Sequence, residues 1–227
     1  MKITFISDTH TRQRNLTLEG GDILIFAGDA MSTGYYPQEL TEFIDWFKAQ
    51  PYKYKVAIAG NHDRYCESFP QYQVRDMFER YYDDGVRYVC DEEITVEGLR
   101  IYGTPYQPFF CDWAFNVPDS DRLSTIYNNI PEGLDILITH CPPYDILDKS
   151  HLPRPRFGTN GEEPLGSKEL LNRLDMMEQP PKINVFGHIH GDGGKIIEEG
   201  GTKFINASVC DEAYKVVNNG VTILYGE

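Results

Sequence analysis

The stretch Ile23-Leu24-Ile25-Phe26-Ala27-Gly28-Asp29 joins an unbroken apolar run directly to a glycine and a carboxylate. A run of this length without polar alternation is typical of a strand that is buried on both faces of a sheet. The pattern recurs four times, as Ile3-Thr4-Phe5-Ile6 before Ser7-Asp8-Thr9-His10, Val56-Ala57-Ile58-Ala59 before Gly60-Asn61-His62-Asp63, Ile136-Leu137-Ile138-Thr139 before His140, and Ile183-Asn184-Val185-Phe186 before Gly187-His188-Ile189-His190. The sequence therefore predicts several buried strands that end in polar side chains.

Apolar residues at helical spacing lie between these runs. Ser167 is the expected N-cap of the last such helix. The periodic positions are Leu40, Phe43, Ile44 and Phe47 after Pro37, then Val74, Met77, Phe78 and Tyr81 after Pro70, and finally Leu170, Leu171 and Leu174. Alternation of strands and helices implies a layered α/β domain.

A second set of short strands with tight turns is predicted at 86–90, 93–97, 99–103, 203–206, 214–218 and 221–225, with a hairpin turn at Asn218-Asn219-Gly220. We therefore expect two sheets packed face to face, with helices outside, in a single domain over 1–227. Residues 104–118 and 141–166 do not fit this scheme, and loops of that length are usually functional or disordered.

The overall composition excludes several classes of protein. The chain has 227 residues, 41% of them hydrophobic and 25% charged, which excludes a disordered chain, a coiled coil and a small disulfide scaffold. Its formal charge of −14 disfavours general nucleic-acid binding and binding to an anionic membrane. The five cysteines form no Cys-x-x-Cys pair, and the N-terminus turns polar too soon for a signal peptide, so we expect reduced thiols in a cytoplasmic protein.

Five of the six histidines follow a buried-strand pattern, and His151 alone does not. Because ligands of open α/β sheets gather outside the carboxyl ends of the strands, the polar residues there should meet at one edge. Carboxylate, imidazole and amide oxygen together suit divalent first-row metals. The expected set is Asp8, His10, Asp29, Asn61, His62, His140, His188 and His190. Asp29 follows a glycine, which leaves room for a carboxylate that bridges two metals.

The ordered motifs Asp8-x-His10, Gly28-Asp29, Gly60-Asn61-His62-Asp63, His140 and Gly187-His188-x-His190 resemble the calcineurin-like metallophosphoesterase superfamily over nearly the whole chain. The stretches 103–108, 113–116 and 206–210 resemble its MPPED branch, which is related to class III cyclic-nucleotide phosphodiesterases. The resemblance implies a four-layer αββα sandwich of two mixed sheets. It also implies one metal held by Asp8, His10, Asp29 and His190, and a second held by Asp29, Asn61, His140 and His188.

The expected function is hydrolysis of phosphodiester bonds in a small molecule, cyclic nucleotides among the candidates, by attack of a metal-bridging hydroxide. Asn61 and His62 would bind the substrate, and His62 would donate a proton to the leaving oxygen. Asp63 either orients His62 or is an exposed turn acid. The resemblance favours manganese, while the ligand types also admit iron, zinc or nickel.

Two other functions stay open, a phosphomonoesterase and a non-catalytic binding scaffold on the same fold. A phosphoprotein phosphatase is disfavoured because the arginine that its branch carries after Gly-Asp is missing from Ala30-Met31-Ser32-Thr33-Gly34. The sequence leaves the oligomeric state open.

Three further features have a structural and a functional interpretation. The aromatic residues of 104–118 (Tyr106, Phe109, Phe110, Trp113 and Phe115) are expected to fill a core rather than stack on a base. His151, Arg154 and Arg156 are expected in a solvated loop rather than on a substrate phosphate. Cys141 is expected to be a packed thiol rather than a ligand.

Overall fold

Two mixed β-sheets pack face to face in the computed structural model, which describes residues 1–80, 85–151 and 163–226. The first sheet has the order β13 (Val221–Leu224), β1 (Lys2–Ile6), β2 (Gly21–Ala27), β3 (Tyr52–Ile58) and β4 (Val86–Tyr88). The second has the order β11 (Ile196–Glu199), β12 (Thr202–Asn206), β10 (Ile183–Phe186), β9 (Ile136–Thr139), β6 (Leu99–Thr104) and β5 (Glu92–Val96). The inner strands pair in parallel, whereas β13, β11 and β5 pair antiparallel with their neighbours.

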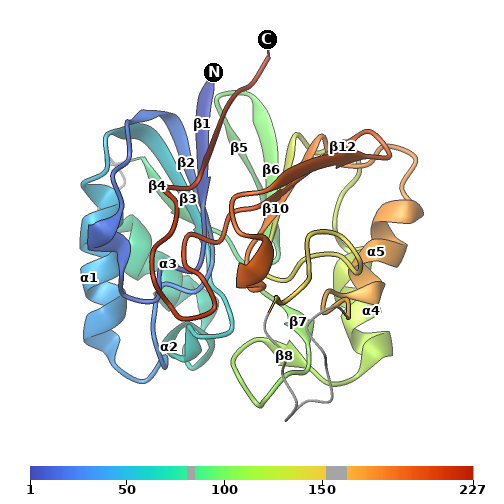
Figure 1. Ribbon diagram of the computed structural model, residues 1–227, viewed down its shortest axis with the longest axis horizontal. Coiled ribbons are helices and arrows are strands. Elements are labelled where there is room, and N and C mark those ends of the chain that lie inside the picture. Colours follow the sequence, from blue (N-terminus) through green and yellow to red (C-terminus); the bar gives the residue numbers. More distant parts are fainter. Residues whose placement is uncertain (81–84, 152–162, 227) are drawn as a thin grey trace.

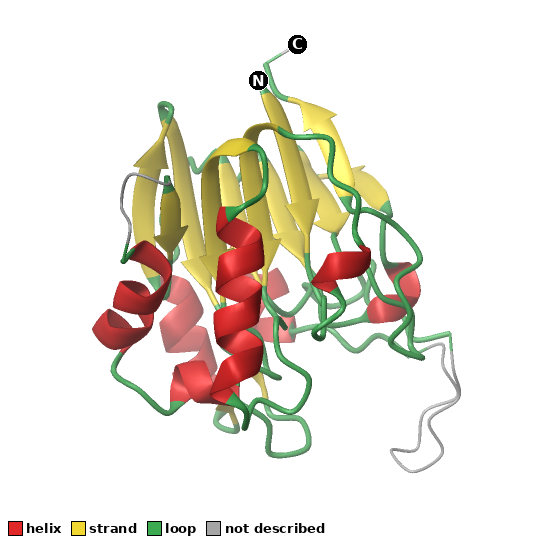
Figure 2. Ribbon diagram, turned by 90° about the vertical axis from the view of Figure 1, so that its left-hand side faces the viewer, coloured by secondary structure: helices red, strands yellow, loops and turns green. Residues whose placement is uncertain are grey.

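Helices cover the outer faces of both sheets, so the molecule has the four layers of an αββα sandwich (Figure 1). On the side of the first sheet lie α1 (Pro37–Lys48), α2 (Arg64–Glu67) and α3 (Gln71–Glu79), and Figure 2 shows them in front of the strands. On the side of the second sheet lie α4 (Ser120–Asn128) and α5 (Lys168–Asp175). Short 3-10 turns occupy Gln13–Asn15 and His190–Asp192, and β7 (Gln107–Pro108) pairs with β8 (Asn116–Val117). The fold predicted from the sequence is confirmed.

The unbroken apolar runs are explained by cores on both faces of the central strands. In β2, Ile23 and Ile25 pack between the two sheets, while Leu24 and Phe26 pack beneath helices α1 and α3. A third core joins the outer face of the second sheet to α4 and α5. A strand covered on both faces needs no polar side, which is why the pattern lacks alternation.

Each predicted helix forms, with Tyr81 outside the described residues. None of the helices in the described ranges is long and apolar enough to cross a membrane.

The later strands are distributed between the two sheets in a way that differs from the prediction. Residues 86–88 and 221–224 join the first sheet, and β11 was not predicted at all. Residues 214–218 were wrongly predicted as a strand, because the Asp211 carboxylate accepts hydrogen bonds from the backbone N–H groups of Ala213 and Lys215, both at 2.9 Å, and closes a loop there. The turn at 218–220 forms, with the Asn218 side chain accepting from Gly220 N–H at 2.8 Å, but it joins no hairpin.

The N-cap of α5 gives a direct test of this architecture. Ser167 is buried and its hydroxyl oxygen accepts the Leu170 N–H at 3.2 Å. Ser167→Ala should lower the free energy of unfolding by about 1 kcal/mol, measured by urea denaturation, because the cap donor loses its partner. Ser124→Ala is the control, since Ser124 lies in the middle of α4 rather than at a cap, and it should change stability by less than about 0.5 kcal/mol. Equal effects of the two variants would contradict the capping role.

Candidate metal centre

The predicted polar residues meet where the carboxyl ends of the two sheets face each other. Asp8, Asp29 and His188 each lie two residues beyond the end of a strand, and their φ angles are +56°, +64° and +67°. This left-handed conformation is uncommon outside glycine, although Asp, Asn and His adopt it more readily than other residues. The turn aims each side chain inward, across the seam between the sheets.

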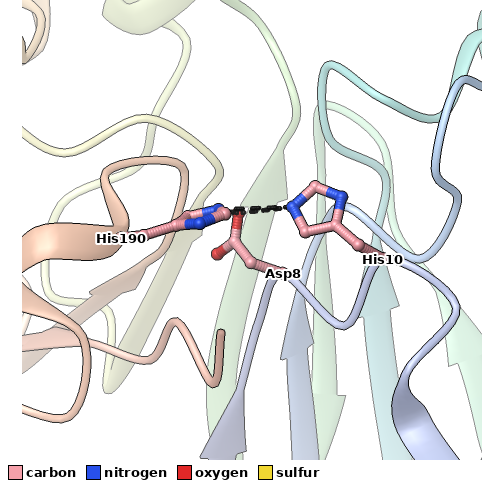
Figure 3. Close-up of side chains that lie close together, drawn as sticks. All are labelled: Asp8, His10 and His190. Atoms are coloured by element: carbon pink, nitrogen blue, oxygen red, sulfur yellow. Dashed lines mark hydrogen bonds and ion pairs between the residues drawn. The ribbon is translucent and has the colours of Figure 1, made fainter. Parts of the chain in front are cut away.

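One group of ligand atoms gathers around the carboxylate of Asp8. Its Oδ1 lies 3.2 Å from His190 Nε2 and 3.8 Å from His10 Nε2, and the two imidazole nitrogens are 3.2 Å apart. Figure 3 shows the two rings approaching each other beside the carboxylate. These three residues come from the ends of β1 and β10, which belong to different sheets.

A second group gathers on the other side of Asp29. Asp29 Oδ2 lies 3.7 Å from His10 Nε2, and its Oδ1 lies 3.3 Å from His140 Nε2. The Asn61 side-chain oxygen lies 2.9 Å from His140 Nε2 and 2.7 Å from His188 Nδ1. Asp29 therefore stands between the two groups, in the position expected of a bridging carboxylate.

Backbone carbonyls fix the tautomers of three of the imidazoles. The Nδ1 atoms of His10, His140 and His190 lie 3.2, 2.8 and 2.9 Å from the carbonyl oxygens of Met31, Ala27 and Asp211. Because a carbonyl only accepts, each Nδ1 carries a proton, and each ring turns its Nε2 into the site.

This arrangement fits a bound cation. The Nε2 atoms of His10 and His190 lie only 3.2 Å apart, and both are within 3.8 Å of Asp8 Oδ1, so one cation could contact all three atoms. Imidazole nitrogens with buried carboxylate and amide oxygens are a donor set for divalent first-row metals. The described residues thus include Asp/His clusters that could hold such ions, Asp8–His10–His190 and Asp8–Asp29–His140 among them.

The two carboxylates are held in the charged form. Burial pushes the pKa of Asp8 upward, but the hydrogen bond and charge of His190 outweigh it and bring the pKa below its usual range. Burial opposes the charge of Asp29 in the same way, and His140 brings the pKa of Asp29 well below its usual value. Both side chains are therefore anionic, as metal ligands must be.

The imidazoles divide into two kinds. Burial lowers the pKa of His10 to about 4 and that of His188 to about 3, so both rings are neutral. Burial also works against the charge of His140, but the Asp29 carboxylate raises the pKa of His140 to about 9. A proton on His140 and a metal cation would compete for the same nitrogen, so metal binding at this ring releases a proton.

Three glycines allow the ligands to approach each other. A Cβ on Gly187 would lie 2.0 Å from Asp8 Oδ2, and a Cβ on Gly60 would lie 2.3 Å from Asp29 Oδ1. A Cβ on Gly28 would lie 2.6 Å from His140 Nδ1, at a φ of +100°. The glycines of the three motifs are thus required by space, and Gly28 is required by its backbone conformation as well.

Asp63 has a role that differs from both interpretations of the sequence, an orienting residue for His62 and an exposed turn acid. Its side chain is buried and accepts hydrogen bonds from the backbone N–H groups of Asp29 (2.9 Å), Met31 (2.9 Å), Gly60 (2.8 Å) and Ala30 (3.4 Å). It does not bond to the imidazole of His62, and it is not an exposed turn acid. Asp63 instead fastens the loop that carries Asp29 to the loop that carries Asn61.

His62 lies at the rim of the same site. Its N–H donates to Asp29 Oδ1 at 2.7 Å, its Nδ1 contacts the Ser32 carbonyl, and its ring packs edge-on against His10 at 4.6 Å. The carbonyl accepts the Nδ1 proton, which directs Nε2 away from Ser32.

Ser208 and Asn206 were given no role in the sequence analysis. The Ser208 hydroxyl donates to Asp8 Oδ2 at 2.7 Å, and the Asn206 amide donates to the Ile189 carbonyl at 2.7 Å. Ser208 lies two residues beyond the end of β12, which is the offset shared by Asp8, Asp29 and His188. That shared offset is the signal that would have found it.

A pocket opens beside both clusters, and its wall combines polar residues of the site with aromatic and apolar side chains. The lining residues are Asp29, Asn61, His62, Pro108, Phe109, Phe110, Trp113, Cys141, Leu165, His188, Ile189, His190, Glu212 and Tyr214. Cys141 is buried and its thiol lies 3.4 Å from the Pro142 carbonyl, which supports a packed thiol. His151 lies 3.4 Å from Asp192 rather than in this lining, while Arg154 and Arg156 fall outside the described residues.

The calcineurin-like phosphoesterase family has a sequence model that matches residues 1–192. The chain belongs to this family. Human Metallophosphoesterase domain-containing protein 1 is 39% identical over 238 aligned positions, which cover 96% of this chain and 69% of the human protein.

Two solved structures show the same fold at low sequence identity. One is the phosphopantetheinyl hydrolase of Mycobacterium tuberculosis, with a TM-score of 0.54, 15% identity and coverage of 94% of this chain and 90% of that chain. The other is the protein TT1561 of Thermus thermophilus, with a TM-score of 0.57, 14% identity and coverage of 95% of this chain and 96% of that chain.

Membership of the calcineurin-like phosphoesterase family implies a metal-dependent phosphoric ester hydrolase, and the Asp/His clusters at the sheet edge agree with that chemistry. The identity to the human protein also agrees with the resemblance to the MPPED branch.

The close approach at Gly187 yields a test of the clusters. Gly187→Ala should lower metal affinity by about tenfold or more, measured by titration of chelator-treated protein, because the new methyl group displaces the Asp8 carboxylate. Gly200→Ala is the control, since nothing lies within 4 Å of a Cβ there although φ is +57°, and it should bind metal as the wild type does. Unchanged affinity in Gly187→Ala would show that Asp8 is not a ligand.

Proposed function

We propose that this protein hydrolyses phosphodiester bonds of a small molecule with two divalent metal ions at the seam between its sheets. Asp8, His10 and His190 would hold one ion, and Asn61, His140 and His188 the other, with Asp29 shared by both. The position of Asp29 between two groups of ligand atoms carries the proposal. The core between the two sheets takes residues from both, which supports a single catalytic domain over 1–227.

The local charge suits a phosphate substrate. When bound, divalent ions neutralise phosphate oxygens and lower the pKa of a coordinated water. Two such ions outweigh the charges of Asp8 and Asp29, so the floor of the pocket becomes positive despite the net charge of −14. The acidic surface elsewhere repels polyanions, which supports a small substrate rather than a nucleic acid.

His62 is the proposed proton donor to the leaving oxygen. Its Nδ1 is held by the Ser32 carbonyl and its backbone N–H by Asp29, so the ring is fixed beside both clusters, and its imidazolium form, with both ring nitrogens protonated, would donate from Nε2 and become neutral. It lines the pocket together with Asn61, which supports the proposal that both contact the substrate.

The wall of the pocket favours a diester over a monoester. A monoester dianion carries more charge than a diester, and the described residues that line the pocket include no Lys or Arg to hold it. Phe109, Phe110 and Tyr214 instead offer apolar and aromatic surface to the second substituent of a diester. Cyclic nucleotides are one class of diester with a flat substituent of that kind.

The deciding experiment is an activity matrix on chelator-treated protein. Mn²⁺, Fe²⁺, Zn²⁺ and Ni²⁺ are each tested with bis-p-nitrophenyl phosphate, p-nitrophenyl phosphate and a cyclic nucleotide. The proposal expects a diester to be cleaved faster than the monoester, with manganese the favoured metal. Faster cleavage of p-nitrophenyl phosphate would indicate a phosphomonoesterase, and no hydrolysis with any metal would indicate a binding scaffold.

His62→Asn separates proton transfer from metal binding. Because His62 lies near His10 and Asp29 and could itself complete a cluster with them, its role is decided by metal content. The variant should keep both metal ions, measured by atomic emission, and lose activity by about a hundredfold or more. A parallel loss of metal and activity would make His62 a ligand instead.

A further inference from the structure

The segment Gln107–Val117 is fastened to Asn61 and to the residues that follow it. Its aromatic residues were expected to fill a core, but Phe109, Phe110 and Trp113 line the pocket instead. The Ala114 N–H donates to the Asn61 carbonyl at 3.0 Å, and the Phe115 N–H donates to Glu67 Oε1 at 2.7 Å. The Arg64 guanidinium donates to the Asp112 carbonyl. The segment is therefore docked on α2 and on the loop that leads into it.

Trp113 lies at the centre of this contact, with its ring flat on His62. The centroids of the two rings are 4.1 Å apart and their planes differ by 23°. The Arg64 guanidinium lies 5.6 Å from the Trp113 ring and 5.4 Å from the ring of Tyr35. A cation over an aromatic face is attractive, so Arg64 helps to hold the indole in place.

Three residues near Trp113 have a left-handed backbone conformation. Cys111, Asp112 and Phe115 have φ angles of +53°, +50° and +54°, a conformation that costs energy for residues with side chains. Asn116 closes the turn, because its side chain accepts from Phe110 N–H at 3.4 Å and donates to the Phe110 carbonyl at 3.0 Å. Strain of this kind persists where surrounding contacts fix the chain, and it clusters at functional sites.

The ring of His62 is restrained on several sides at once. Nδ1 is held by the Ser32 carbonyl, His10 packs edge-on at 4.6 Å, and Trp113 covers the ring at a 23° tilt. The torsion that turns an imidazole about its Cβ–Cγ bond is broad, so the ring needs such neighbours to keep one direction. Without Trp113, the His62 ring could rotate more freely. The face of the ring that Trp113 covers would also be exposed to solvent.

We propose that Trp113 is a positioning residue, which holds the His62 imidazole in the orientation that delivers its Nε2 proton to the leaving oxygen. This inference rests on the proton-donor role of His62 in the proposed function. Trp113 itself transfers no proton and binds no metal. Its contribution to the rate passes through His62, because a displaced donor loses the geometry that proton transfer requires.

A double-mutant cycle tests this dependence. Trp113→Leu should lower kcat by about tenfold, with KM within about twofold and both metal ions retained, because the ring that orients His62 is gone. Trp113→Phe keeps a flat ring and should retain at least half of the wild-type kcat. In the His62→Asn background, Trp113→Leu should cause no further loss, since there is no imidazole left to orient.

Several results would overturn the proposal. An equal loss from Trp113→Leu in the wild-type and His62→Asn backgrounds would show a role independent of His62. A rise in KM with unchanged kcat would make Trp113 a substrate contact, and loss of metal would make its role structural. A wild type that cleaves no phosphoester ends the proposed function, whereas an active wild type that is insensitive to Trp113→Leu ends this inference alone.

Fluorescence supplies a readout that requires neither activity nor a substitution at 113. The chain has two tryptophans, so Trp46→Phe leaves Trp113 as the sole tryptophan emitter. Trp46 is on α1, packed near Phe43 and away from the pocket lining, and Trp46→Phe should leave turnover unchanged. Adding His62→Asn to this background should change the emission intensity of Trp113, because the stacked imidazole is removed. Identical spectra would contradict the stacking.

Discussion

The concentration of charge at the seam between the two sheets constrains the rest of the molecule. Asp8 and Asp29 are buried and anionic, and imidazole rings surround them, with the Nε2 atoms of His10 and His190 only 3.2 Å apart. Burying unpaired charge costs several kcal/mol for each ion, so such a cluster persists only where opposite charge compensates it. Metal cations bound by the Asp/His clusters would supply that charge.

A few recurring structural features position the ligand atoms of the site. Asp8, Asp29, His188 and Ser208 each lie two residues beyond the end of a strand. The strand ends therefore place these side chains at the same edge of the sheets. Backbone carbonyls select the tautomers, and Asp63 ties two of the ligand loops together through backbone N–H groups. The scaffold thereby fixes the direction of each donor atom before any ion binds, which is the preorganisation that catalysis by charge stabilisation requires.

The features predicted from the sequence are those encoded by neighbouring residues. Buried strands such as 23–27 and the cap at Ser167 follow from local pattern, and the histidines were found because they follow such strands. Features that depend on distant partners were not predicted. The order of the sheets places β13 beside β1, from opposite ends of the chain, and no local signal reports that pairing. The hydrogen bonds of Asp63 and the stacking of Trp113 on His62 likewise join segments that meet only in the folded protein.

The proposed hydrolysis requires two metal ions that share Asp29. The most direct measurement is anomalous X-ray diffraction from crystals of the protein loaded with Mn²⁺. We expect two anomalous peaks at the seam, one beside Asp8, His10 and His190 and the other beside Asn61, His140 and His188, with Asp29 in contact with both. Absence of peaks at this edge, or two peaks of which neither contacts Asp29, would contradict the account.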